Sequence, residues 1–281
     1  MRAVRLASAV VTAAVLVGGV TACGSSAKSA ADTKGGDTKA AGDAVAGALG
    51  GDPKAALAAS ALVMQKAGNG KVTMVAPDGS THTGGSGDAD WKDPGKTSVD
   101  LTGEMDTKKL RIRVVGTDVY LGGGDAEAAA LGGKHWVKMP AGNEMGDGLL
   151  LMTQMLNPVV QLTLAAANKP TKVGQEAVEG TQATHIRSVE DTSTMVAGMT
   201  GLSPEQRQAV QKSLEQDGKT ITVDLWLDAK QQLVQLQEFG DKNGEHDAVT
   251  VKYTGLGSAA KIAAPAAADL GNPADILKLL G

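Results

Sequence analysis

The chain is 281 residues long, 42% of them hydrophobic and 21% charged, which is too apolar for a wholly disordered chain. It is also long enough to fold without disulfides or a structural metal. The 27 Lys and Arg residues against 31 Asp and Glu residues give a net charge of −4 with no long basic run, so nucleic acid is not an expected partner. The single cysteine excludes a disulfide framework and every multi-cysteine zinc or iron–sulfur site.

Residues 1–22 have the features of a secretory signal peptide. Arg2 and Arg5 precede an apolar stretch from Leu6 to Val20, and small residues follow it. The stretch has 15 residues, fewer than the roughly 20 of a membrane-spanning helix, and it is diluted by Ala, Ser, Thr and Gly. We therefore expect residues 1–22 to direct export and to form no part of the fold.

The run Val20-Thr21-Ala22-Cys23 resembles the lipobox of bacterial lipoproteins, in which an aliphatic residue and two small residues precede a cysteine. The resemblance implies cleavage before Cys23, a diacylglycerol thioether on its sulfur and acylation of the new amino group. Two or three acyl chains anchor a protein stably, whereas one chain holds it only marginally. We expect Cys23 to be the lipid anchor on the outer face of the cytoplasmic membrane; the alternative is a secreted protein with a free thiol.

Residues 24–52 consist mainly of Gly, Ala, Ser, Thr, Lys and Asp, with almost no large apolar side chain. Such a composition predicts a flexible tether, and a chain of about 28 residues spans roughly 30 Å on average. The expected organisation is a signal peptide over 1–22, a lipidated cysteine and tether over 23–52, a globular domain over 53–266, and a C-terminal tail with a short helix over 267–281. The globular domain can thus stand off the membrane and still reach it.

Hydrophobic periodicity predicts an α+β domain built mainly of about ten short strands. The period of two is clearest where Val99, Leu101 and Met105 alternate with polar residues, which indicates an antiparallel sheet with one wet face. Successive strands joined by hairpin-length turns favour a meander, with the helices gathered on one face. The predicted strands cover 71–76, a polar segment ending near 91, 98–105, 110–114, 119–121, 135–139, 172–176, 182–189, 221–227, 233–239 and 249–253. The predicted helices cover 53–66, 147–167, 193–199 and 204–215.

The most apolar stretch after the signal peptide runs from Asp147 to Ala167. Pro158 is expected to interrupt this helix, because proline lacks an N–H group and obstructs the preceding turn. Leucine, methionine and valine occur on more than one helical face, so the helix must bury two sides. One side can pack on the sheet, and the other can contact either protein or bound lipid.

The sequence contains no recognisable catalytic or metal-binding motif. The four histidines, His82, His135, His185 and His246, are scattered without i, i+4 spacing or a cysteine partner, which argues against a zinc site. The segment Gly255–Ala260 fits a relaxed dinucleotide-binding pattern, but only 21 residues follow it, too few for the rest of such a unit. We therefore expect no enzymatic activity, no metal site and no cofactor.

After the lipobox, the tether and the first predicted helix come three strand segments whose order along the chain indicates a family: Arg111–Leu121, Gly133–Lys138 and Thr220–Asp228. Together these parts resemble the LppX/LprG-type lipoproteins of mycobacteria and their actinobacterial relatives, which share the half-barrel fold of the lipoprotein carriers LolA and LolB. The similarity covers roughly residues 53–266. It implies a curved antiparallel β-sheet, or half-barrel, with helices packed on its concave face around a cavity for acyl chains or a whole lipid.

The resemblance further implies a membrane-anchored lipoprotein that binds or carries lipid, with the lipid and the cytoplasmic membrane as its partners. The low aromatic content and the many flexible methionines suit an adaptable apolar cavity. The candidate cavity-lining residues are Leu149, Met152, Met155, Leu156, Val159, Met195 and Met199.

Two alternatives remain open at the level of sequence. The same methionines can be ordinary core residues, and the half-barrel would then be an interaction or sensor module of the cell envelope without lipid cargo. A protein partner would in that case bind through the strand that carries Arg111 and Arg113. A hydrolase of the envelope is the other alternative, for which the sequence offers no motif.

Overall fold

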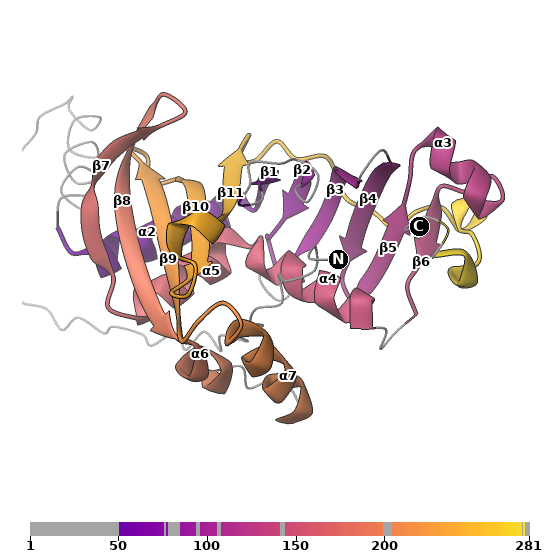
Figure 1. Ribbon diagram of the computed structural model, residues 1–281. Helices are drawn as coiled ribbons and strands as arrows, with labels where there is room; N and C mark the ends of the chain where they lie inside the picture. Colours follow the sequence, from indigo (N-terminus) through magenta and orange to yellow (C-terminus); the bar gives the residue numbers. More distant parts are fainter. Residues whose placement is uncertain are drawn as a thin grey trace, which may run out of the picture.

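The computed structural model describes residues 51–278, apart from 76, 78–84, 94–95, 106–107, 141–143, 199–203 and 277. The signal peptide, Cys23 and most of the tether lie outside the described residues. Eleven antiparallel strands form one curved, open sheet (Figure 1). They are β1 (Asn69–Val75), β2 (Gly85–Asp90), β3 (Ser98–Met105), β4 (Lys108–Val115), β5 (Asp118–Gly122), β6 (Trp136–Lys138), β7 (Thr171–Val178), β8 (Thr181–Asp191), β9 (Thr220–Asp228), β10 (Leu233–Gly240) and β11 (Val249–Thr254). The predicted fold class, an α+β half-barrel, is confirmed.

The sheet joins two meanders, because its spatial order is β6-β5-β4-β3-β2-β1-β11-β10-β9-β8-β7. Each meander follows the chain, as the short turns predicted. The junction between them is the long-range pairing of β1 with β11, where Val72 lies opposite Tyr253. β6 and β7 are the two edges of the sheet, so the barrel stays open (Figure 1).

The helices of the described residues are α2 (Pro53–Ala67), α3 (Asp125–Ala128), α4 (Glu144–Met155), α5 (Pro158–Ala167), α6 (Thr192–Gly198) and α7 (Pro204–Leu214). The first of them, α2, begins as the sequence predicts: the Asp52 side chain accepts a hydrogen bond from the Lys54 amide, and Pro53 occupies the first turn. Gly68 ends the helix with φ +71°, a left-handed conformation that glycine adopts readily.

The predicted break at Pro158 separates α4 from α5. Asn157 caps the new helix, because its side chain accepts hydrogen bonds from the Val159 and Val160 amides. The Asn157 amide also donates to the Thr97 hydroxyl at 2.9 Å, and both residues are buried. The break is therefore a fixed corner that turns α5 away from α4.

Three helices cover one face of the sheet, called here the inner face and defined by Val72, Leu225, Leu236 and Val251. Hydrogen bonds at their backbones tie them to it: the Trp91 indole donates to the Met64 carbonyl of α2 at 2.7 Å, and Ser188 donates to the Ala165 carbonyl of α5. Tyr253 donates to the Leu156 carbonyl at the end of α4. The inner-face side chains form one apolar core with these helices.

The remaining helices do not all join this layer, although the sequence predicted them on one face. α6 and α7 lie instead at the end of β8 and β9 (Figure 1). The chain after β11, including the C-terminal tail, crosses the other face of the sheet, called here the outer face: Arg113 donates to the Ala263 carbonyl, and Lys134 donates to the Ala268 carbonyl. The tail thus covers part of the outer face of the N-terminal meander.

Candidate functional site

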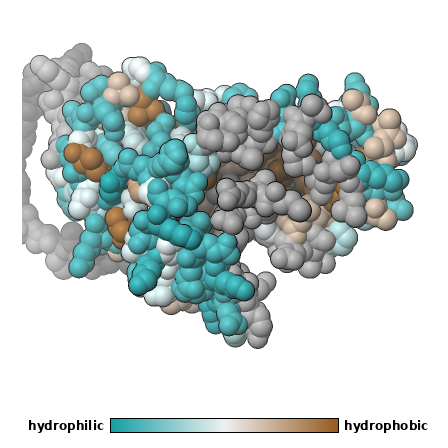
Figure 2. Space-filling view, viewed as in Figure 1, coloured by the Kyte–Doolittle hydropathy of each residue, from teal (hydrophilic) through white to brown (hydrophobic). Residues whose placement is uncertain are grey.

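Some apolar residues at the inner face of the N-terminal meander are covered incompletely. Leu149 and Leu150 of α4 and Ile112 of β4 are only partly buried, although they pack against the core. Figure 2 shows hydrophobic surface in the part of the molecule where β3 and β4 lie. An apolar face that remains partly open is a feature of binding sites for apolar ligands.

A small, partly open cavity of about 10 Å³ lies under the C-terminal end of α4. Its wall is almost wholly apolar. The lining residues are Met74 of β1, Met152 and Met155 of α4, Leu156, Leu236 and Glu238 of β10, and Val249 and Val251 of β11. Methionine side chains are unbranched and flexible, so this wall can adapt to a larger occupant.

The structure brings three of the seven predicted cavity residues, Met152, Met155 and Leu156, to this cavity. Leu149 and Val159 are partly buried and pack against the core beside it. Met195 belongs to α6, and Met199 lies outside the described residues. A role of these residues in binding lipid stays a prediction.

Glu238 is the residue that sequence reasoning missed. It lies opposite Val223 of β9 and Val249 of β11, so its side chain is on the inner face among apolar neighbours. Within the described part of the chain its carboxyl group has no hydrogen-bond or ion-pair partner. Burial raises the pKa of the Glu238 carboxyl to about 7, and the charge of Asp217 adds to the shift.

A β-bulge explains why the sequence did not reveal this carboxyl group. Leu233 and Leu236 are three residues apart, yet both are buried, because the register shifts between Leu233 and Gln235. Strict alternation from Leu233 would put Glu238 on the wet face. One signal in the sequence was available: Glu238 is two residues after the apolar Leu236, and residues two apart in a strand share a face.

Tyr253 closes the cavity region from the side of β11. Its hydroxyl donates to the Leu156 carbonyl at 3.4 Å, and its ring meets Trp91 edge-on with centroids 6.2 Å apart. Burial raises the pKa of Tyr253, and the charge of Glu238 raises it further. Tyr253 therefore remains a neutral hydrogen-bond donor that holds the corner after α4 in place.

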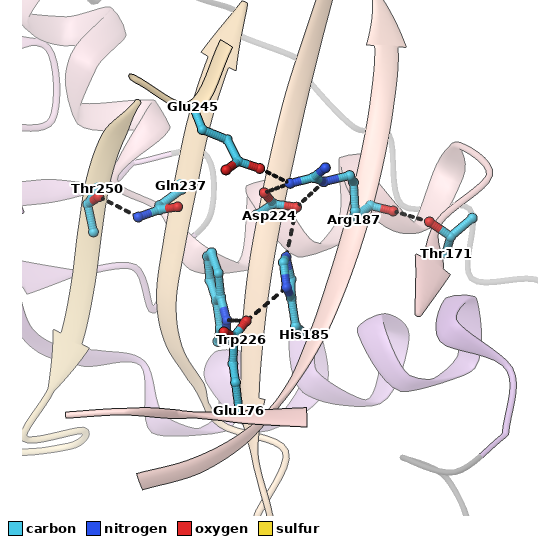
Figure 3. A network of polar contacts seen from close by, with 9 residues as sticks. All are labelled: Thr171, Glu176, His185, Arg187, Asp224, Trp226, Gln237, Glu245 and Thr250. Atoms are coloured by element: carbon cyan, nitrogen blue, oxygen red, sulfur yellow. Dashed lines mark hydrogen bonds and ion pairs between the residues drawn. The ribbon is translucent and has the colours of Figure 1, made fainter. Parts of the chain in front are cut away.

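A second cluster of polar groups lies on the outer face of the C-terminal meander and borders an open groove of about 640 Å³ (Figure 3). Asp224 of β9 is at its centre, with a side chain only 2% exposed. Arg187 donates to both oxygens of Asp224, at 2.7 and 2.6 Å, and also reaches Glu245. His185 Nε2 lies 2.9 Å from Asp224 Oδ1, at ion-pair distance but without hydrogen-bond geometry.

The other side of His185 completes this cluster, which the sequence also did not reveal. His185 Nδ1 is 2.9 Å from Glu176 of β7, and the Trp226 indole donates to the same carboxylate. The His185 and Trp226 rings stack with centroids 4.4 Å apart. Burial by itself would raise the pKa of Asp224, but the contacts from Arg187 and His185 outweigh it and hold that pKa below its ordinary value. Arg187 bonds both oxygens of the buried Asp224 and also Glu245, which is typical of a structural network.

The described residues contain no group of three or more His, Cys, Asp and Glu side chains placed to bind a metal ion. Among the helices that the structure describes, none is long and apolar enough to cross a membrane.

Comparison with known proteins gives a relative but no matching family model. The relative is an uncharacterized 31.2 kDa protein of Streptomyces griseus from the rplA–rplJ intergenic region, 32% identical over 248 residues. The match covers 79% of this chain and 80% of the relative. The chain belongs to the family of this Streptomyces protein.

Solved structures that resemble the present chain include LprF from Mycobacterium bovis and the lipoprotein LppX from Mycobacterium tuberculosis. LprF is 16% identical, with 76% of this chain and 96% of LprF covered and a TM-score of 0.48. LppX is 12% identical, with 75% of this chain and all of LppX covered and a TM-score of 0.46. The LppX/LprG-type lipoproteins to which the sequence was compared thus reappear in the comparison of structures.

Proposed function

We propose that the protein is a non-enzymatic lipoprotein that binds or carries lipid or acyl chains on the inner face of its open sheet. The observation that carries the proposal is the cavity under α4, walled by Met152, Met155 and Leu156, on a face whose apolar residues Leu149 and Leu150 are only partly buried. Transfer of an acyl chain from water into such a wall is favourable by about 0.8 kcal/mol for each buried CH₂ group.

The cavity of about 10 Å³ is smaller than an acyl chain, so binding requires α4 to shift. Leu149 and Leu150 of α4 are only partly buried, which supports a movement of this helix. Its two ends differ, since Tyr253 and Asn157 hold the corner at Leu156. We therefore propose that the N-terminal part of α4 lifts from β3 and β4 while its C-terminal end acts as the hinge.

Anchoring is the second part of the proposal. Lipid attached to Cys23 would hold the protein at the outer face of the cytoplasmic membrane, and residues 24–52 would let the domain reach the bilayer. A donor membrane within roughly 30 Å supplies lipid to the cavity without diffusion through water. The lipid and the membrane are then the two expected partners.

Native mass spectrometry with lipid extraction tests this function on the chain from residue 24 onward, produced in an actinobacterial host. We expect a discrete adduct of lipid mass that extracts into organic solvent. A bare chain that takes up no lipid from added vesicles would contradict the proposal.

A substitution in the cavity wall supplies the second test. Met155→Lys puts a charge into the wall, so lipid uptake from vesicles is expected to fall by about tenfold or more while the circular dichroism spectrum stays native. Leu62→Lys is the matched control, because Leu62 is 73% exposed on α2. Equal uptake by a folded Met155→Lys variant would place the lipid elsewhere.

The small size of the cavity also supports a second candidate, an envelope interaction module with a filled core. Arg111 and Arg113 are not free to recruit its partner, because both guanidinium groups lie 4.5 Å from the Trp136 ring and form ion pairs with Asp100. A protein partner would therefore bind elsewhere. Co-purification of a stoichiometric protein with the anchored chain, together with absence of lipid, would favour this candidate.

A further inference from the structure

The carboxyl group of Glu238 stands in the wall of the proposed lipid cavity. Among the described residues that line the cavity, Glu238 alone carries a polar side chain. Its neighbours across the sheet, Val223 and Val249, offer it no hydrogen bond. Glu238 is partly buried, and within the described residues no protein group bonds its carboxyl oxygens, so a hydrogen-bond donor brought by a ligand would find an unused acceptor there.

The space beside Glu238 limits what such a partner can be. A cavity of about 10 Å³ admits a group about as large as one water molecule. A hydroxyl group meets that limit, and it can donate a hydrogen bond to the carboxyl oxygen in either protonation state of the acid. A bulky head group does not fit there without further movement of the wall.

Charge narrows the choice further. Glu238 is the acidic residue among the described residues that line the cavity, and the charge of Asp217 acts on it electrostatically. A phosphate or a free carboxylate brought to the same place would meet charges of its own sign in a poorly solvated environment. Zwitterionic phospholipids carry a phosphate too and meet the same obstacle.

We propose that Glu238 is the polar end of the lipid cavity and selects neutral acyl lipids that carry a free hydroxyl group over anionic lipids. This proposal rests on the proposed function, since it concerns the same cavity. The hydroxyl donates to Glu238 below the end of α4, and the acyl chains lie along the apolar inner face beside Leu149 and Leu150.

The test uses the full chain, reconstituted in vesicles that contain a small fraction of a lipid with a diazirine at the end of one acyl chain. Three such lipids with the same acyl chains are compared: diacylglycerol with one hydroxyl, triacylglycerol with none, and phosphatidic acid with an anionic group. Irradiation and peptide mass spectrometry give the yield and the location of each crosslink. We expect diacylglycerol to exceed each of the other two by about tenfold, on peptides from the α4 region and β10.

Two substitutions separate the two parts of the selection. Glu238→Leu removes the acceptor, so the preference of diacylglycerol over triacylglycerol should disappear. Glu238→Gln keeps an acceptor and removes the charge, so that preference should remain while phosphatidic acid gains about tenfold. Glu245→Gln is the matched control, because it removes a carboxylate from the outer face and should leave all three yields unchanged.

Each outcome identifies which proposal fails. Crosslinks in the cavity that are equal for the three lipids, or unaltered by Glu238→Leu and Glu238→Gln, overturn the selection by Glu238 and leave lipid binding intact. Crosslinks that fall only on the tether or the outer face overturn the proposed function itself. Preference for phosphatidic acid in the unmodified protein overturns the exclusion of anionic lipids.

Discussion

Two carboxyl groups lie on neighbouring strands of the same sheet and face opposite sides of it. Asp224 of β9 is on the outer face, where Arg187 binds both of its oxygens and His185 approaches from the other side. Glu238 of β10 is on the inner face, and the described residues supply it with no partner. The pKa of Asp224 is lowered, whereas the pKa of Glu238 is raised to about 7.

The ionised carboxylate of Asp224 therefore stabilises the fold, whereas the ionised carboxylate of Glu238 destabilises it. Asp224 links β8, β9 and, through Arg187 and Glu245, the segment before β11. The contacts of Asp224 offset the cost of its burial. Glu238 has no such compensation, and a local conflict of this kind is expected at a functional site.

Removing the partner of Asp224 would turn it into a second uncompensated carboxylate. Arg187→Met keeps much of the side-chain volume but removes the ion pair with Asp224. The Asp224 side chain, which is 2% exposed, would then have His185 as its remaining partner. We expect a loss of about 3 kcal/mol in the free energy of unfolding, measured by urea denaturation at neutral pH. This is the largest effect predicted for a single substitution in the sheet.

Lys71→Met is the control for that substitution. It breaks the exposed ion pair of Lys71 with Asp88, and pairs of this kind contribute about 0 to 1 kcal/mol. If Arg187→Met cost no more than Lys71→Met, the outer-face cluster would not be the structural network described above.

Replacing Glu238 should raise the free energy of unfolding, whereas replacing Arg187 should lower it. Its pKa is raised in the folded state, so the stabilisation associated with the protonated form is complete below the ordinary pKa of 4.5 and is lost as the pH rises through about 7. Glu238→Gln removes this loss, and at about pH 8 the variant should exceed the unmodified protein by at most about 3 kcal/mol in the free energy of unfolding. Urea denaturation near pH 4.5 and near pH 8 measures the difference.

The exposed carboxyl of Glu104 on β3 provides the comparison for this pH dependence. Glu104→Gln should leave the change of stability with pH as it is in the unmodified protein. Asp217 and Tyr253 are the titratable groups that interact electrostatically with Glu238. A Glu238→Gln variant that still lost stability over the same pH range would assign the effect to another group.

The smallest effect concerns a paired carboxylate at the surface. Asp269 of the C-terminal tail accepts a hydrogen bond from the His135 amide and lies 2.9 Å from His135 Nδ1, and this contact raises the pKa of His135. The stabilisation is present below the ordinary pKa of 6.5 and is lost as the pH rises through the raised value. Hydrogen exchange in the tail segment 267–269, corrected for the intrinsic pH dependence, should therefore become faster over that range.

His135→Asn tests the assignment of this tail contact. The variant should exchange quickly in the tail at every pH, with global stability almost unchanged. Unaltered exchange in the tail would show that the Leu270 bridge to Trp136 and the other backbone contacts hold it without His135.

Much of the fold followed from local patterns in the sequence. The cap at Asp52, the break at Pro158 and the alternation in β3 each predicted an element that the structure contains. The hairpin order of both meanders also followed, because short turns leave neighbouring strands few other arrangements. The position of α6 and α7 at the end of the strands was not predicted, since periodicity shows that a helix is amphipathic but not against which surface it packs.

The candidate site was predicted only in part. Met152, Met155 and Leu156 could be proposed as cavity residues because they lie in the most apolar stretch, where a helix must bury two sides. Glu238 could not be assigned to the same cavity, because the bulge between Leu233 and Gln235 reverses the alternation of β10. The partners of Asp224, His185 and Arg187, come from β8, and Glu245, which also binds Arg187, comes from the segment before β11; no local pattern brings these segments together.

The sequence by itself predicted the export signal, the lipobox, the class of the fold and the hairpin order of the strands within each meander, since these depend on composition, short motifs and local periodicity. The tertiary structure decided which carboxylate is paired and which is exposed to the cavity. That outcome depends on the pairing of β1 with β11, on the register of β10 and on the seat of α4 over the inner face. Contacts between residues far apart in the chain determine the environment of a carboxylate. That environment determines whether the carboxylate stabilises the fold or stays available for a ligand.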